Sequence, residues 1–162
     1  MTPLGALESS ALAQAMRQWL WLYPSVEIAH LVGVGLLFGS IAILDLRLLG
    51  LSRRIAVRAL AAHVLPWSAA SFALIVPSGL LMFVAHAGEF IASPVFVLKM
   101  CLIMAAALNA AAFHAITFRT VDVWDSEEMR RLTPPPSARL AGTLSLALWA
   151  SVIACGRLLA YF

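Results

Sequence analysis

The sequence predicts an all-α integral membrane protein, a four-helix bundle preceded by an N-terminal interfacial helix. Three observations lead to this fold class. The 162 residues are 62% hydrophobic and only 12% charged, a composition unlike that of a soluble globular domain. The mean hydropathy is +0.93. Four apolar stretches are each long enough to cross a hydrocarbon core of roughly 30 Å, and a backbone inside lipid satisfies its own hydrogen bonds by forming helices.

The N-terminal segment, residues 1–22, is predicted to lie along the membrane surface. Trp19 and Trp21 close it at the depth where aromatic side chains gather in membrane proteins. An amphipathic helix before such a belt lies in the plane of the interface. A lid over an outer site and a docking face for a partner are alternatives. Its apolar side chains recur at near-helical spacing: Leu4, Leu7, Leu12, Met16 and Leu20.

The membrane helices are predicted at residues 23–50, 60–87, 94–118 and 140–162, within one domain, 23–162. Positively charged loops stay in the cytoplasm, so we expect both basic connections there and both termini outside a bacterial inner membrane. The formal net charge of +3 then reflects topology, and no nucleic-acid partner is expected. The arginines that set this orientation lie around the first and third connections: Arg47, Arg53, Arg54, Arg58, Arg119, Arg130, Arg131 and Arg139.

All four histidines of the chain lie in or at the edge of these stretches: His30, His63, His86 and His114. Ionisable side chains are rare inside a bilayer and usually functional. Depth counted from the predicted helix ends pairs His30 with His86 near the outer face, and His63 with His114 near the inner face. Two imidazoles from different helices at one depth can hold a b-type haem as axial ligands. The sequence therefore predicts a bis-histidine haem b.

The outer pair is the favoured haem site because charged side chains accompany it. Lys99 and Arg157 are cations within helices near that face and suit the carboxylates of haem propionates. Glu27 lies one helical turn before His30 and is expected to orient a ligand or to pair with one of these cations. Gly79, before His86, would let a flat macrocycle approach the backbone.

The inner pair, His63 and His114, is a candidate for a second haem, with Arg47 and Asn109 nearby. Against this, His63 and His86 differ by roughly 140° around an ideal helix, although prolines in the same helix can rotate it. A single haem, with His114 as a quinone or proton site, stays open. One or two haems are thus expected.

Methionine and cysteine form a second constellation, which suits copper(I) or merely fills gaps in the core. The absence of a C-x-x-C-H motif argues against covalent haem attachment. The residues concerned are Met82, Met100, Met104, Cys101 and Cys155.

The chain has two resemblances to known membrane proteins. The plan of four helices with histidines in two layers resembles the small membrane cytochromes b, among them the superoxide oxidases and the ascorbate-reducible electron carriers. The chain departs from them because its fourth helix has no histidine and its second has two. More specifically, residues 21–114 resemble a bacterial family of four-helix membrane proteins without an established activity. That likeness rests on Trp21-Leu22-Tyr23-Pro24, His30, the run 45–50, Pro66-Trp67, Lys99 and the run 109–114.

The cytochrome resemblance implies haem b and electron transfer, often with a quinone as one reactant. We therefore expect a membrane cytochrome, a quinone-linked oxidoreductase, that carries electrons between an outer-face redox partner protein and a quinone or inner-face acceptor. The alternatives are a copper or proton-coupled transporter and a non-catalytic subunit of a larger respiratory complex. Lipid is the expected surroundings, and assembly into a homo-oligomer stays open.

Overall fold

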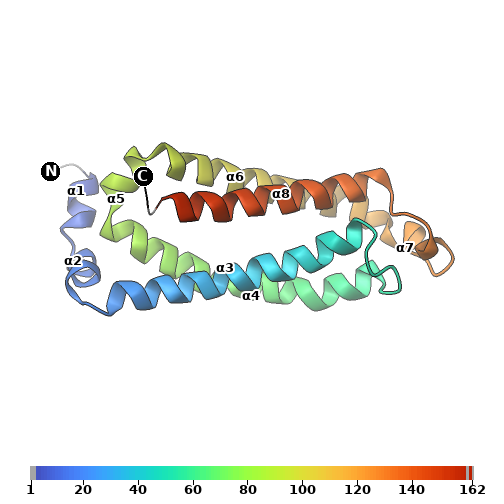
Figure 1. Cartoon of the computed structure of the whole chain (residues 1–162), viewed down its shortest axis with the longest axis horizontal. Coiled ribbons are helices and arrows are strands. Elements are labelled where there is room, and N and C mark those ends of the chain that lie inside the picture. Colours follow the sequence, from blue (N-terminus) through green and yellow to red (C-terminus); the bar gives the residue numbers. More distant parts are fainter. Residues whose placement is uncertain (1–2, 160, 162) are drawn as a thin grey trace.

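The computed structural model describes residues 3–159 and 161, and these are helical apart from short turns (Figure 1). The predicted fold class is confirmed, since the structure has four helical spans long and apolar enough to cross a membrane, as expected of a multi-pass membrane protein. They are α3 (Leu22–Leu48), α4 (Val57–Ala85), the stretch Pro94–Trp124 that begins with α6 (Pro94–Ala112), and α8 (Pro136–Leu158).

The spans are arranged as two antiparallel pairs, α3 with α4 and α6 with α8, and α3 also contacts α8 (Figure 1). One end of the bundle carries α1, α2 and the end of α8, and we call it the terminal end. The other carries the arginine-rich connections, 49–56 and 118–135, and we call it the basic end. The cluster of buried apolar side chains lies toward the basic end: Leu44, Leu48, Val57, Ala61, Val64, Phe113, Val121 and Ala138.

Helix α3 ends in a turn that only glycine adopts easily. The N–H of Gly50 donates to the carbonyl of Arg47 at 3.0 Å, and that of Leu51 to the carbonyl of Leu46 at 3.0 Å. This pattern is a Schellman motif, which needs a left-handed residue after the helix. Gly50 supplies it with φ +101°. The predicted end of this helix, residue 50, therefore lies two residues beyond the last helical residue.

Helix α4 starts and ends differently from the prediction of residues 60–87. Its first residue is Val57, because the Asp125 carboxylate from the distant loop accepts the backbone N–H of Val57 at 2.6 Å. At the other end His86 leaves helical geometry, with φ −140° and ψ 42°. A separate short helix, α5 (Ala87–Ala92), follows it. The periodicity of apolar residues predicts neither the start at Val57 nor the break at His86.

The N-terminal segment forms two short helices, α1 (Pro3–Glu8) and α2 (Ala11–Gln18), packed across the terminal end. The Arg17 guanidinium donates to the last carbonyl of α4, at Ala85, at 2.7 Å. The Glu8 carboxylate accepts the N–H of Gly88 in α5 at 2.7 Å. Both contacts satisfy backbone groups that a helix end leaves unpaired. The segment therefore covers the ends of α4 and α5.

The third span changes its helical type near the basic end. The α-helix ends at Ala112, and residues Phe113–Thr117 form a π-helix, followed by a 3-10 turn and α7 (Val121–Trp124). π-helical turns are rare and occur often at functional sites. His114 lies in this turn. The fourth span starts at Pro136, whose fixed φ suits the first position of a helix, so it begins before the predicted residue 140.

Candidate functional site

His30 of α3 lies against α4 with a defined hydrogen bond. Its Nδ1 is 2.9 Å from Ser78 Oγ. The Ser78 hydroxyl has one proton and donates it to the Leu74 carbonyl one turn earlier. Ser78 Oγ therefore accepts from His30, and the imidazole carries its proton on Nδ1. The His30 side chain also hydrogen-bonds the backbone of Ile75. A neutral imidazole with its proton on Nδ1 has a lone pair on Nε2, the form found in metal-ligating histidines whose other nitrogen donates to a neighbour.

A glycine makes room for this imidazole. A Cβ built on Gly79 would lie 3.3 Å from Cε1 of His30. The ring thus rests directly on the α4 backbone. Gly35, another glycine of the span that contains His30, has no heavy atom within 4 Å of a built Cβ. Gly79 is therefore the glycine of this pair that positions the imidazole.

Lys99 of α6 lies on the same level of the bundle as His30. It interacts electrostatically with His30, as does Glu27 one turn away. Its Nζ is 3.7 Å from a Cβ built on Gly156 of α8, and the side chain is half-buried. Among residues 3–159 and 161 no carboxylate forms an ion pair with Lys99. The His30 imidazole and the unpaired Lys99 ammonium therefore come from opposite helix pairs.

A second set of polar side chains lies nearer the basic end than His30, Ser78 and Lys99. Asp45, His63 and His114 lie nearer the basic end than the level of His30. In each of three spans, the residue at the level of His30 and the residue nearer the basic end are fifteen positions apart, which is about 22 Å along a helix. The pairs are His30 and Asp45 in α3, Ser78 and His63 in α4, and Lys99 and His114 in the third span.

The structure does not bring His30 and His86 together. His86 packs edge-on against Tyr23 at 5.8 Å between ring centroids, and its Nδ1 is 3.4 Å from the Glu89 carboxylate. Tyr23 lies seven residues from His30, and His86 seven residues from Gly79, an offset of about 10 Å along each helix. Two imidazoles on one metal would place their nitrogens only about 4 Å apart.

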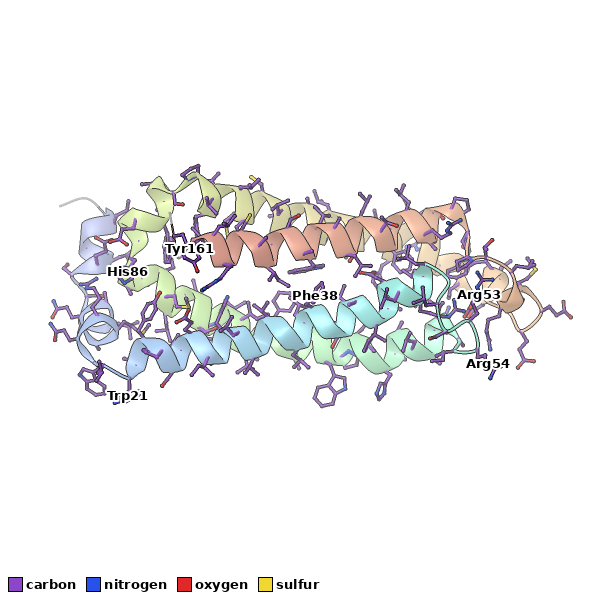
Figure 2. The ribbon with its side chains drawn as sticks, in the orientation of Figure 1. Trp21, Phe38, Arg53, Arg54, His86 and Tyr161 are labelled. Atoms are coloured by element: carbon purple, nitrogen blue, oxygen red, sulfur yellow. The ribbon has the colours of Figure 1, made fainter. Side chains whose placement is uncertain are left out.

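Arg157, another outer candidate, has a partner of its own. The Arg157 guanidinium donates to the Tyr161 hydroxyl at 2.7 Å and lies 5.0 Å above that ring. Glu27 is exposed. Figure 2 shows Tyr161 and His86 at the terminal end, far from Arg53 and Arg54 at the basic end.

The inner candidates are not gathered into one site. His63 and His114 share a depth, but both are exposed on the surface of the bundle. His114 Nδ1 is 2.9 Å from the Ala110 carbonyl, and its ring contacts Phe118 at 5.3 Å. Asn109 donates instead to the Ala141 carbonyl of α8 at 3.0 Å. These contacts tie His114 to its own span and Asn109 to α8.

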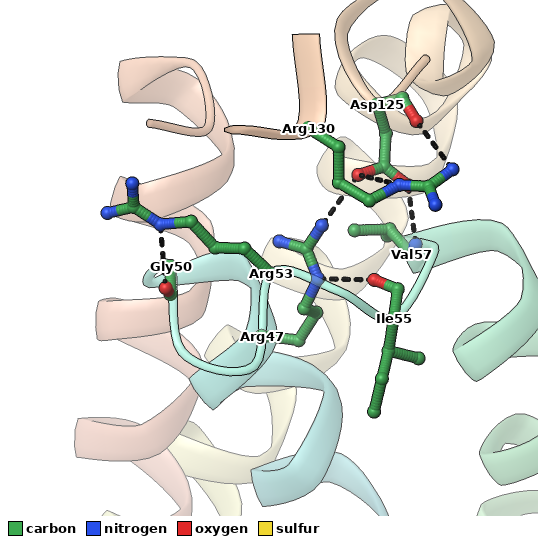
Figure 3. A network of polar contacts seen from close by, with 7 residues as sticks. All are labelled: Arg47, Gly50, Arg53, Ile55, Val57, Asp125 and Arg130. Atoms are coloured by element: carbon green, nitrogen blue, oxygen red, sulfur yellow. Dashed lines mark hydrogen bonds and ion pairs between the residues drawn. The ribbon is translucent and has the colours of Figure 1, made fainter. Parts of the chain in front are cut away.

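Arg47 belongs to a buried network at the basic end (Figure 3). Its guanidinium donates to Asp125 at 2.6 Å and to the Ile55 carbonyl at 2.6 Å. Only 2% of the Arg47 side chain and 5% of the Asp125 side chain are exposed. Asp125 also accepts from Val57 N and interacts with Arg130. Arg47 and Asp125 together therefore connect the end of α3, the start of α4 and the residue that follows α7.

The sulfur side chains are scattered. Cys155 is buried near Lys99, whereas Cys101, Met100 and Met104 are exposed. In the described part of the chain no three His, Cys, Asp or Glu residues are grouped so as to hold a metal ion.

Sequence reasoning missed two residues of these sites. Ser78, which orients His30, is a polar residue inside an apolar span, and its polarity is the feature of the sequence that could have marked it as a site residue. Asp125 had no comparable signal, since its partners lie 78 and 68 positions earlier. Comparison of the chain with protein-family models, curated proteins and solved structures finds no match. The function is therefore inferred from the site itself.

Proposed function

We propose that the protein is a membrane redox protein that binds haem b at His30. The observation that carries the proposal is the hydrogen bond from His30 Nδ1 to Ser78 Oγ, which orients the imidazole in the tautomer whose ligand atom is Nε2. Gly79 accommodates the ring, and the unpaired Lys99 supplies a cation for a propionate. Haem, when bound, supplies one-electron transfer, and the protein supplies position and electrostatics.

The residues present fit haem only in part. His30 is oriented by Ser78, whereas His86 lies on another level in the described arrangement. His86 forms the junction of α4 and α5, where the backbone leaves helical geometry. The proposal therefore rests on His30, and His86 as second ligand remains a prediction. A second haem at His63 and His114 lacks a comparable arrangement, since both are exposed.

By this proposal electrons pass between a partner at the terminal end and a quinone or an acceptor at the basic end. The basic end faces the cytoplasm of a bacterial cell by the charge rule for loops. The positive charge of Lys99 would stabilise the reduced state of the bound haem, which carries less positive charge than the oxidised state. Replacing Lys99 with methionine should therefore lower the reduction potential while leaving the haem content high.

The decisive experiment compares haem content per chain in matched histidine variants. His30→Ala should lose the haem, whereas His114→Ala and His63→Ala, at the other level, should keep it. To separate ligand loss from misfolding, imidazole is added to a His30→Gly variant and should restore the absorbance. Equal haem content in His30→Ala and wild type would overturn the proposal. His86→Ala tests the second ligand, since it should convert a low-spin spectrum to a high-spin one.

A further inference from the structure

Asp45 is a buried acid within the membrane span of α3, one turn from the basic end. Only 5% of the residue is exposed, and its Oδ2 has no hydrogen-bond partner. Helix α8 packs directly on it, since a Cβ built on Gly142 would lie 3.1 Å from the Asp45 carbonyl oxygen. Ser145 of α8 hydrogen-bonds the Asp45 side chain. This acid is therefore enclosed, with one oxygen free.

No cation compensates a negative charge at Asp45 in the described residues. Arg47, two positions later, is committed to Asp125 and the Ile55 carbonyl. Arg139, the charged residue of α8 nearest to Gly142 in sequence, is exposed. An isolated carboxylate is costly in an apolar interior. The site thus favours binding of a cation, either a proton or a metal ion, at Asp45 Oδ2.

The choice of that cation follows from the number of oxygens. Hard metal cations take six or more oxygen ligands. Among the described residues the polar side chain given to Asp45 is the Ser145 hydroxyl. A proton needs one lone pair, which Asp45 Oδ2 offers. The donor set therefore suits a proton and not a metal ion.

We propose that Asp45 is a proton-exchanging site of the membrane domain. On release the O–H bond breaks, its electron pair stays on the carboxylate, and the proton passes to water at the basic end. The path is short, because Asp45 lies three residues, about 4.5 Å along the axis, from the last residue of α3. Acidic residues within membrane spans commonly form proton relays. The proposal does not depend on haem at His30, about 22 Å away.

Infrared titration of the full chain in lipid tests this proposal. We expect a carboxylic-acid carbonyl band that shifts in D2O and declines as the pH is raised. The band should be absent in Asp45→Asn. It should persist in Asp122→Asn, because Asp122 is exposed and paired with Arg58.

Two results would overturn the proposal. A band that survives in Asp45→Asn assigns the proton to another group. An Asp45 band of constant intensity over the whole pH range shows a fixed proton with a structural role. Should Asp45→Asn fail to fold, Ser145→Ala provides the assignment, because loss of the hydroxyl should shift the frequency of the Asp45 band without removing it. An unshifted band in Ser145→Ala would also contradict the proposal.

Discussion

Replacing Asp125 with alanine removes the central acceptor of the basic-end network. Asp125 and Arg47 are 5% and 2% exposed, and their ion pair is 2.6 Å long. Loss of one partner leaves the other charge buried and unpaired, which costs about 3–5 kcal/mol. The same change removes the cap on the first N–H of α4, at Val57, an effect of about 1 kcal/mol that overlaps with this figure. We therefore expect the free energy of unfolding to fall by about 3–5 kcal/mol.

The chain offers a matched control in a second Arg–Asp pair. Arg58 and Asp122 are also 2.6 Å apart but are 55% and 70% exposed. Asp122→Ala should cost only between about 0 and 1 kcal/mol. Both values can be measured by SDS-induced unfolding in mixed micelles, followed by tryptophan fluorescence. Equal losses in the two variants, or a loss below about 1 kcal/mol for Asp125→Ala, would refute the reasoning that burial decides the effect.

Two further predictions concern the terminal end. Gly79→Val should reduce the haem content sharply, because even a Cβ there would lie 3.3 Å from the His30 ring. Gly35→Val should leave the haem content unchanged. Haem absorbance per chain measures both variants, and equal haem content in the two would show that Gly79 does not position the ring. Arg17→Ala should speed amide exchange in residues 11–18, because its guanidinium no longer holds the Ala85 carbonyl; exchange as slow as in wild type would contradict a fastening role for this contact.

Much of the fold could be predicted because hydrophobic length alone specifies membrane spans. The positions of the four spans follow from the apolar stretches, and Pro94 at the start of α6 coincides with its predicted boundary. The ends of α3 and α4 could not be predicted as well. They depend on the Schellman turn at Gly50 and on Asp125, which reaches Val57 from the far side of the sequence.

The site was predictable in its residues but not in their pairing. Depth counted from the loops places His30 and Lys99 on one level, and their side chains interact electrostatically in the structure. It places His63 and His114 on another level, which stays a prediction. It also assigned His86 to the level of His30, from which the structure separates it by about 10 Å. Counting residues gives depth only to within a turn or two, because helix ends and tilts shift the register. The direction in which a side chain points is set by the packing of the helices, and the depth of a residue in the membrane does not predict that direction.

The central claim, that this chain binds haem b at His30, is tested most directly by one spectrum. The full chain is expressed with ample haem supply and purified in detergent, and its dithionite-reduced minus oxidised difference spectrum is recorded. We predict a Soret band and an α band, both lost in His30→Ala. A flat spectrum from well-folded wild-type protein would contradict the claim and leave His30 and Lys99 without their proposed ligand.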